Sequence, residues 1–161
     1  MRILSIDEAR SVDSHTSKEL GIQSETLMRN AGKAVAEKVK KMLAVDSGIR
    51  VLLLCGKGNN GGDGYAAAEL LVSWGFDCFI YSSVAQNQIS GEAKTFHDRC
   101  AESGLEITYE LKSSDISLSD FDLILDGLLG TGIKGQVRPD TAEWIDAINE
   151  SNVSILYIDI S

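Results

Sequence analysis

Residues 51–71 read VLLLCGKGNNGGDGYAAAELL, which joins an apolar run, a glycine-rich segment and a pattern typical of a helix. Five of the nine residues from 56 to 64 are glycine, more than we expect packing to require. A strand that ends in such a loop and continues as a helix allows the backbone to approach a ligand closely. The stretch therefore predicts a strand–loop–helix unit whose loop binds a ligand.

Apolar runs and helical patterns alternate along the rest of the chain. A first helix is expected over 5–20. A second helix is expected to follow it, with Ser24 as its N-cap and Gly48 closing it. The apolar face of the capped helix is expected to contain Leu27, Ala31, Val35, Val39 and Met42. Further strands are expected over 50–55, 77–82, 105–110, 121–126 and 153–160, and further helices over 63–74, 89–103 and 139–150. The alternation predicts an α/β fold, a Rossmann-like three-layer αβα sandwich with a mainly parallel central sheet and a helical N-terminal leader.

The last expected strand, 153–160, reaches almost to the end of the sequence. We expect it to be a central strand, and a ligand-binding loop normally follows such a strand. The chain is therefore expected to form a single domain over 1–161 that is incomplete at its C-terminal end.

Composition excludes several classes of function. The 161 residues carry a formal net charge of −9, which argues against nonspecific nucleic-acid binding. Apolar runs such as VLLLC are far shorter than the ~20 residues that span a bilayer, so no membrane contact is expected. No CxxC pair and only two histidines, His15 and His97, are present, which disfavours a zinc site. The three cysteines are expected to be buried free thiols of a cytoplasmic protein.

Three strands are followed or ended by residues that could do chemistry. Residues 56–64 follow the first strand, Asp126 ends the fourth and Asp159 lies near the end of the fifth. In a doubly wound sheet these positions share the edge at which ligands bind. The segment after Asp126 offers backbone amides, a hydroxyl and a cation suited to phosphate oxygens: Gly130, Thr131, Gly132, Ile133, Lys134, Gly135 and Gln136.

The glycine-rich segment fits standard phosphate motifs poorly. It lacks the GK[ST] ending of a P-loop, and its formal match to GxGxxG is a weak signal. Asp77 is the acidic residue at about the spacing expected for a ribose ligand, but it opens a strand. An ordinary redox dinucleotide site is therefore disfavoured.

The polar residues of this segment have structural alternatives. Asp63 could be a helix N-cap, Asn59 and Asn60 could be left-handed turn residues, and Asp126 could cap the next loop. Asp159 has fewer structural explanations, because strands disfavour aspartate. Amide and carboxylate oxygens without histidine or cysteine would suit a hard cation.

These residues resemble the YjeF N-terminal family of NAD(P)H-hydrate epimerases, over essentially the whole chain. The resemblance rests on GxGNNGGDG at 56–64, on Asp126 with the following Gly130-Thr131-Gly132, on Asp159-Ile160-Ser161, and on LMRNAG at 27–32. It implies an isomerase of metabolite repair that interconverts the R and S epimers of hydrated NADH or NADPH.

The resemblance also implies roles for individual residues. Substrate contacts are implied for Asn59, Asn60, Gly61, Gly62, Asp63, Gly130, Thr131, Gly132, Ile133, Lys134, Gly135, Gln136 and Asp159. A potassium ion is implied at Asn60 and Asp126, completed by a serine just past Ser161. The family usually reads Asp-Ile-Pro-Ser-Gly at its last motif, so Ser161 stands here at the proline position.

Chemistry at the hydrated carbon requires a group that gives and takes a proton. We expect Asp159 to be this catalytic acid and base, with Asp63 as the alternative. A dehydratase specific for one epimer is the implied partner, as a second domain or a separate protein, and a homo-oligomer is possible through the N-terminal helices. The alternative function is a non-catalytic ligand- or protein-binding module of the same family, but the coexistence of Asn60, Asp63, Asp126 and Asp159 favours the enzyme.

Overall fold

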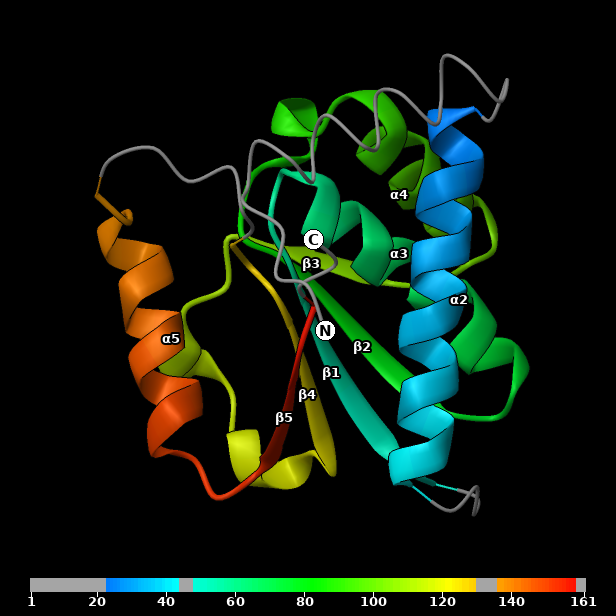
Figure 1. Ribbon diagram of the computed structural model, residues 1–161. Coiled ribbons are helices and arrows are strands. Elements are labelled where there is room, and N and C mark those ends of the chain that lie inside the picture. Colours follow the sequence, from blue (N-terminus) through cyan, green and yellow to red (C-terminus); the bar gives the residue numbers. More distant parts are fainter. Residues whose placement is uncertain (1–22, 44–47, 130–135, 159–161) are drawn as a thin grey trace, which may run out of the picture.

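The computed structural model describes residues 23–43, 48–129 and 136–158 (Figure 1). The predicted alternation of strands and helices is confirmed over these residues, whereas the predicted helix over 5–20 lies outside them. The elements are α2 (Ser24–Met42), β1 (Arg50–Cys55), α3 (Asn59–Ser73), β2 (Asp77–Ser82), η1 (Gln86–Gln88), α4 (Gly91–Glu102), β3 (Ile107–Tyr109), η2 (Ser113–Asp115), η3 (Leu118–Asp120), β4 (Leu123–Gly127), α5 (Pro139–Glu150) and β5 (Ser154–Tyr157).

The five strands form one sheet in the order β3-β2-β1-β4-β5, and every pair is parallel. Helices cover both faces, so the predicted Rossmann-like three-layer α/β fold is confirmed. The expectation that the last strand is central is wrong for the described residues, because β5 pairs with β4 alone and lies at the edge of the sheet. Its apolar sequence reflects the packing of Leu156 and, directly after the strand, of Ile158, which are both buried.

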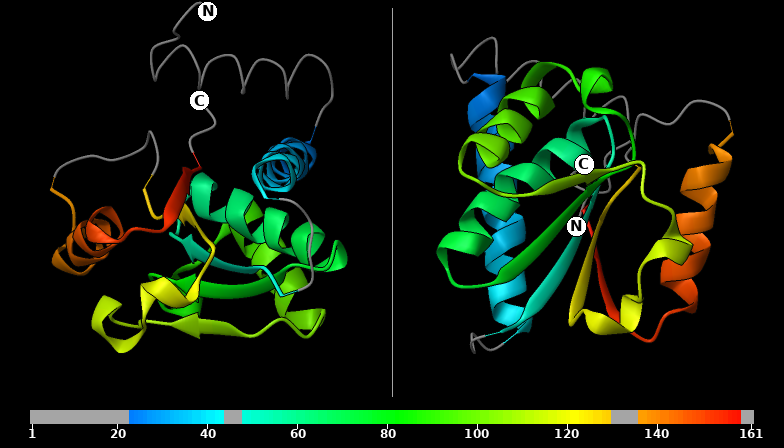
Figure 2. Two further views of the ribbon diagram at one scale, coloured as in Figure 1. Left: turned by 90° about the horizontal axis from the view of Figure 1, so that it is seen from below. Right: turned by 180° about the vertical axis from the view of Figure 1, so that it is seen from behind.

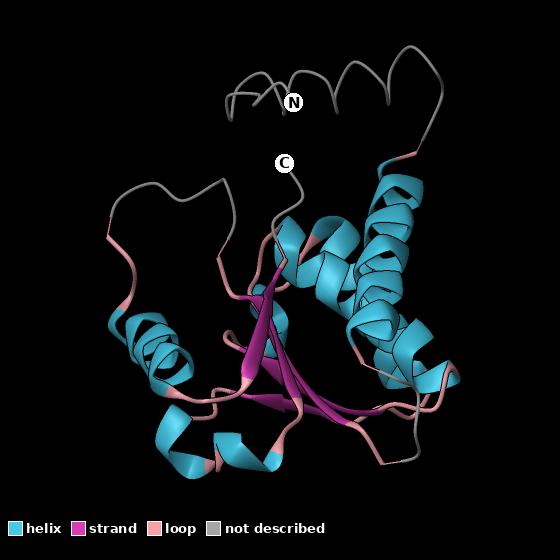
Figure 3. Cartoon of the chain, turned by 60° about the horizontal axis from the view of Figure 1, so that its bottom comes forward, coloured by secondary structure: helices cyan, strands magenta, loops and turns pink. Residues whose placement is uncertain are grey.

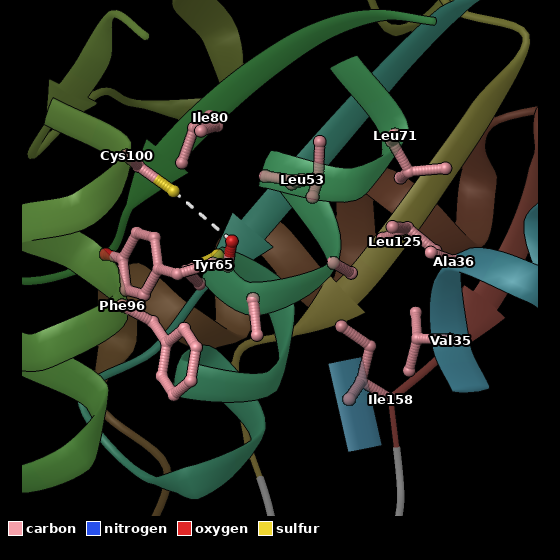
Figure 4. Packing of buried hydrophobic residues seen from close by; sticks show 14 of the residues in the cluster. Val35, Ala36, Leu53, Tyr65, Leu71, Ile80, Phe96, Cys100, Leu125 and Ile158 are labelled. Carbon is pink, nitrogen blue, oxygen red and sulfur yellow. Dashed lines mark hydrogen bonds between the residues drawn. The ribbon is translucent and has the colours of Figure 1, made fainter. Parts of the chain in front are cut away.

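The core lies in two layers on either side of β1. Val51, Leu53 and Cys55 face a cluster built with α2, α3 and α4, whereas Leu52 and Leu54 face a second cluster with α5. This period of two places buried side chains on both faces of the strand. Figure 1 and Figure 2 show α5 on one side of the sheet and α2 with α3 on the other. Figure 4 shows Leu53, Leu71 and Leu125 inside the first cluster.

Helix α2 presents a somewhat different face to the core than its apolar pattern predicts. Val35 and Val39 are buried as expected, but Met28, Gly32 and Ala36 complete the buried face and Met42 is 45% exposed. The reason is close packing against α3: a Cβ atom added at Gly32 would lie 2.9 Å from the carbonyl carbon of Ala66. Small residues allow the two helices to approach closely. The spacing of large apolar residues does not predict that these small residues are buried.

Candidate functional site

Hydrogen bonds join the carboxyl ends of three strands, along the edge of the sheet at which the parallel strands end. The Gly56 N–H donates to the Gly127 carbonyl at 2.9 Å, which ties the end of β1 to the end of β4. The Ile158 N–H donates to the Asp126 carbonyl at 2.9 Å and ties the residue after β5 to the same place. Figure 3 shows the strands converging toward this edge. The predicted convergence of the three segments therefore holds as far as Ile158.

Helix α3 begins inside the glycine-rich segment, at Asn59, and not at residue 63 as predicted. Gly58 is the N-cap residue, and its carbonyl accepts the Gly62 N–H at 3.1 Å. Glycine has a low helix propensity, so the sequence alone favours a loop here. Tertiary packing overrides this preference.

Asp63 and the two asparagines are consequently helical. Asp63 is the fifth residue of α3 and only 5% exposed, so it is not the N-cap. Asn59 and Asn60 are not left-handed, because Glu110 is the only non-glycine residue with positive φ in the described chain. Both structural alternatives for these residues are therefore wrong.

Most glycines of this segment serve packing, which contradicts the expectation from the sequence. A Cβ atom at Gly61 would collide with the carbonyl of Gly56, and one at Gly62 would meet Met28 of α2 and lie 3.1 Å from the Ala93 Cα of α4. A Cβ atom at Gly64 would lie 2.8 Å from the Cys55 Sγ. The beginning of α3 is thus enclosed on three sides by the end of β1, α2 and α4.

Asn60 links the beginning of α3 to the segment after β4. Its Nδ2 donates to the Leu129 carbonyl at 2.8 Å, and its side chain is partly buried. Because the amide nitrogen is used in this bond, the Oδ1 atom is the part of the side chain that can accept a donor or a cation. Asn59, one residue earlier, is exposed.

Asp126 lies in β4 beside this link and is 9% exposed. Its Oδ1 accepts the Leu128 N–H at 3.1 Å, so Asp126 does cap the following turn. Within the described residues it takes part in no ion pair. Burial raises the pKa of this carboxyl above its usual value of 3.8, and the Leu128 hydrogen bond opposes the shift. A buried carboxylate with little charge compensation favours a bound cation.

Several predicted site residues lie outside the described residues. They are Gly130, Thr131, Gly132, Ile133, Lys134, Gly135 and Asp159. Gln136 is described and exposed. The described part of the chain holds no group of three or more His, Cys, Asp or Glu side chains placed to bind a metal ion. A cation here would need amide or backbone oxygens in addition to Asp126.

Sequence reasoning overlooked two features of this edge. Lys57 is an exposed cation in the turn between β1 and α3, and its place between Gly56 and Gly58 was the available signal. Met28 packs against Gly62 and so supports the beginning of α3, which only the fold reveals.

The histidine and the cysteines of the described chain make other contacts. His97 is buried in α4, where its Nδ1 contacts the Asp98 Oδ1 at 2.8 Å and its Nε2 contacts the hydroxyl of Tyr109, the last residue of β3, at 2.6 Å. The three cysteines are free, with Cys55 and Cys100 buried and Cys78 partly buried. Among the described residues, no helix combines the length and apolar character that crossing a membrane requires.

Comparison with known proteins gives a consistent family. A family profile described as YjeF-related protein N-terminus matches residues 24–161. The chain is 34% identical over 152 residues to an NAD(P)H-hydrate epimerase of Rhodopirellula baltica, with 94% of this chain and 61% of that protein covered. It is 31% identical to an NAD(P)H-hydrate epimerase of Elusimicrobium minutum, covering 94% of this chain and 71% of that protein.

The chain is also similar to longer proteins and to a solved structure. The chain is 31% identical to a bifunctional NAD(P)H-hydrate repair enzyme Nnr of Thermofilum pendens, covering 99% of this chain but only 31% of that protein. It therefore spans about a third of the length of that relative. The crystal structure of yeast ynu0 has the same fold, with a TM-score of 0.87 at 18% identity over 99% of this chain and 70% of that one.

Proposed function

The chain belongs to the family of YjeF-related protein N-termini, and on this premise we propose that it is an NAD(P)H-hydrate epimerase domain. It would interconvert the R and S epimers of hydrated NADH and NADPH, an isomerase reaction of metabolite repair. The observation that most supports this is the grouping of Asn60, Asp126 and Ile158 at one sheet edge beside the glycine-rich start of α3. Relatives that carry the epimerase name at 31–34% identity support it further.

The reaction needs only a proton donor and acceptor. The hydrated carbon carries a hydroxyl next to the ring nitrogen. An acid gives its proton to this hydroxyl, the C–O bond breaks, and water leaves with the bonding electron pair. The nitrogen lone pair forms a flat iminium ion, water adds to the opposite face, and the proton that this water loses returns to the carboxylate. Such proton transfer typically contributes ~10²–10⁴-fold to the rate.

We assign the acid and base role to Asp159, which follows Ile158 directly in the chain. The hydrogen bond from Ile158 to Asp126 supports this assignment, because it holds the preceding residue at the candidate site. Asp63 remains the alternative carboxylate. Asn59, Gly61, Gly62 and the segment 130–136 would contact the substrate.

Asn60 and Asp126 would hold a potassium ion. The donor set fits, because both residues offer the oxygen ligands that hard cations prefer, and the Asp126 carboxylate is buried without an ion pair in the described chain. When bound, the ion would supply positive charge that offsets this carboxylate beside the substrate. A dehydratase that uses one epimer would be the functional partner, either joined to this domain or separate.

We expect Asp126→Asn to raise the free energy of unfolding at pH 7 in choline chloride, without potassium. Asparagine keeps an oxygen for the Leu128 N–H but carries no charge. Because the folded pKa of Asp126 is raised, the wild type loses stability as the pH rises from 3.8 through that pKa. The advantage of the variant should therefore shrink toward zero near pH 4. Urea unfolding at both pH values measures the difference.

The wild type and Asp126→Asn also test whether Asp126 binds the potassium ion. Replacing choline chloride with potassium chloride at equal ionic strength should stabilise the wild type more than Asp126→Asn, since only the folded wild type binds the ion at this carboxylate. An equal response of both proteins would remove Asp126 from the potassium site. If Asp126→Asn is less stable than the wild type at pH 7 without potassium, the prediction that the buried charge destabilises the folded protein is wrong.

Epimerase activity is tested with purified S-hydrated NADPH and the full-length protein. The expected result is enzyme-dependent appearance of the R epimer, resolved by chromatography, until both epimers reach equilibrium. The spontaneous reaction without protein is the baseline, and heat-denatured protein is the control. Folded protein that leaves the spontaneous rate unchanged, with and without potassium, would refute the proposal and favour a binding module.

A further inference from the structure

Asp98, His97 and Tyr109 form a chain of hydrogen bonds that the proposed epimerase mechanism does not use. The His97 Nδ1 contacts the Asp98 Oδ1 at 2.8 Å, and the His97 Nε2 contacts the Tyr109 hydroxyl at 2.6 Å. His97 and Asp98 lie in α4, whereas Tyr109 ends β3, which β2 separates from β1 and β4 in the sheet. A carboxylate, an imidazole and a hydroxyl therefore follow one another, each in contact with the next.

The direction of both hydrogen bonds follows from the charge on Asp98. Hydrogen bonds from Lys94 and from His97 lower the pKa of this carboxyl below its usual value of 3.8, so it is ionised at pH 7 and can only accept. The His97 Nδ1 must therefore carry a proton. When the ring is neutral, its Nε2 has a free lone pair and accepts the hydrogen bond that the Tyr109 hydroxyl donates.

The imidazole is fixed and shielded, whereas the tyrosine is accessible. The side chain of His97 is 1% exposed, and the Tyr65 ring meets its ring edge-on with 5.3 Å between the centroids. Tyr109 is partly exposed on an edge strand of the sheet. Burial and the Asp98 carboxylate raise the pKa of Tyr109 above its usual value of 10, so the hydroxyl keeps its proton at pH 7. A molecule in solution can therefore reach Tyr109, with its proton held against a base, but cannot reach His97.

We infer that Tyr109 is a modification site, a nucleophile that His97 activates toward the acyl group of activated esters. A hydroxyl that is hydrogen-bonded to a base, with the base oriented by a third group, is the arrangement of an activated nucleophile. The inference does not depend on the proposed epimerase function.

The acyl transfer conserves atoms and charge. The Tyr109 oxygen attacks the ester carbonyl carbon while its proton passes to the His97 Nε2, and the Asp98 carboxylate offsets the charge of the imidazolium that forms. The C–O bond to the leaving group then breaks. The leaving oxygen takes the bonding electron pair and the proton from His97, and an acyl-tyrosine ester remains.

Tyr157 is the internal control for this reaction. It is 58% exposed, and its hydroxyl donates to an amide oxygen, the Asn149 Oδ1, at 3.2 Å. An amide oxygen is not a base at neutral pH. Exposure alone therefore predicts that Tyr157 reacts faster, whereas activation by His97 predicts that Tyr109 does.

The experiment treats the full-length protein with para-nitrophenyl acetate at pH 7 and follows acetylation of each tyrosine by proteolysis and mass spectrometry. Tyr109 is expected to be acetylated about tenfold faster than Tyr157, or more, as for general-base assistance. Equal or slower acetylation of Tyr109 would overturn the inference, because its contact would then only satisfy the buried imidazole.

Variants of α4 show whether this preference depends on the base. His97→Gln, with folding checked by circular dichroism, should lower acetylation of Tyr109 to the rate of Tyr157. Because His97 is buried, Asp98→Asn is the second variant: this side chain is 36% exposed, and loss of its charge should remove part of the rate advantage. Glu102→Gln removes a charge from an exposed residue of the same helix and should change nothing. Unchanged acetylation of Tyr109 in either folded variant of the chain would refute activation by His97.

Discussion

Gly61→Ala is expected to lower the free energy of unfolding by about 3 kcal/mol, at the upper end of the usual cost of overpacking. The added methyl group would collide with the Gly56 carbonyl oxygen and lie 2.7 Å from its carbonyl carbon and 2.8 Å from its nitrogen. These are backbone atoms, and the Gly56 N–H is held by the Gly127 carbonyl at 2.9 Å. The clash therefore cannot be relieved by a side-chain rotation. Urea unfolding measures the loss, and the thermal midpoint should fall by roughly 6–12 °C.

Gly58→Ala is the matched control for this prediction. It adds the same methyl group three residues earlier, where nothing lies within 4 Å. Its cost should be about 1 kcal/mol or less, that of a poorer N-cap residue. Equal destabilisation by the two substitutions would show that glycine is needed along the whole segment for its backbone freedom, and the packing explanation would be wrong.

The element order could be predicted because hydrophobic periodicity depends on neighbours in the sequence. Strand β1, strand β2 and helix α5 begin and end at the expected residues. Their apolar runs and the proline at the start of α5 are local signals. The position of β5 beside β4 alone could not be predicted locally, because an apolar run indicates a strand but does not indicate which strands pair with it.

The meaning of the glycines could not be read from the sequence. At Gly62 the missing side chain allows close contact with α2 and α4. At Gly58 an added side chain would meet nothing within 4 Å. What distinguishes them is Met28 and Ala93, which are about 30 residues away on either side. The early start of α3 has the same cause, since these contacts hold low-propensity residues in a helix.

The candidate site was predictable to the extent that topology determines it. In a parallel sheet the ends of β1, β4 and β5 must share one edge, which brings Asn60 and Asp126 into one region. The hydrogen bond from Asn60 to the Leu129 carbonyl depends on exact register and was not predictable. The roles assigned to Asp159 and to residues 130–135 remain predictions, because these residues lie outside the described part of the chain.

Asp159→Asn in the full-length protein is expected to lower kcat for epimerisation of hydrated NADPH by ~10²–10⁴-fold. Asparagine preserves the size and polarity of the side chain but cannot give or take the proton that the C–O bond cleavage requires. KM should change much less, because substrate contacts are distributed over the glycine-rich segment and residues 130–136. Steady-state rates with each epimer as starting material measure the effect in both directions.

Two further carboxylate variants make this result specific. Asp77→Asn removes a charge from an exposed residue at the opposite, amino end of β2, and should leave kcat unchanged. Asp63→Asn tests the alternative acid, with circular dichroism to confirm that the buried residue still permits folding. Wild-type turnover in Asp159→Asn together with a large loss in folded Asp63→Asn would transfer the acid and base role to Asp63. Losses in both would indicate that two carboxylates divide the work, one for each face of the flat iminium ion, since leaving and returning water occupy opposite sides of the ring.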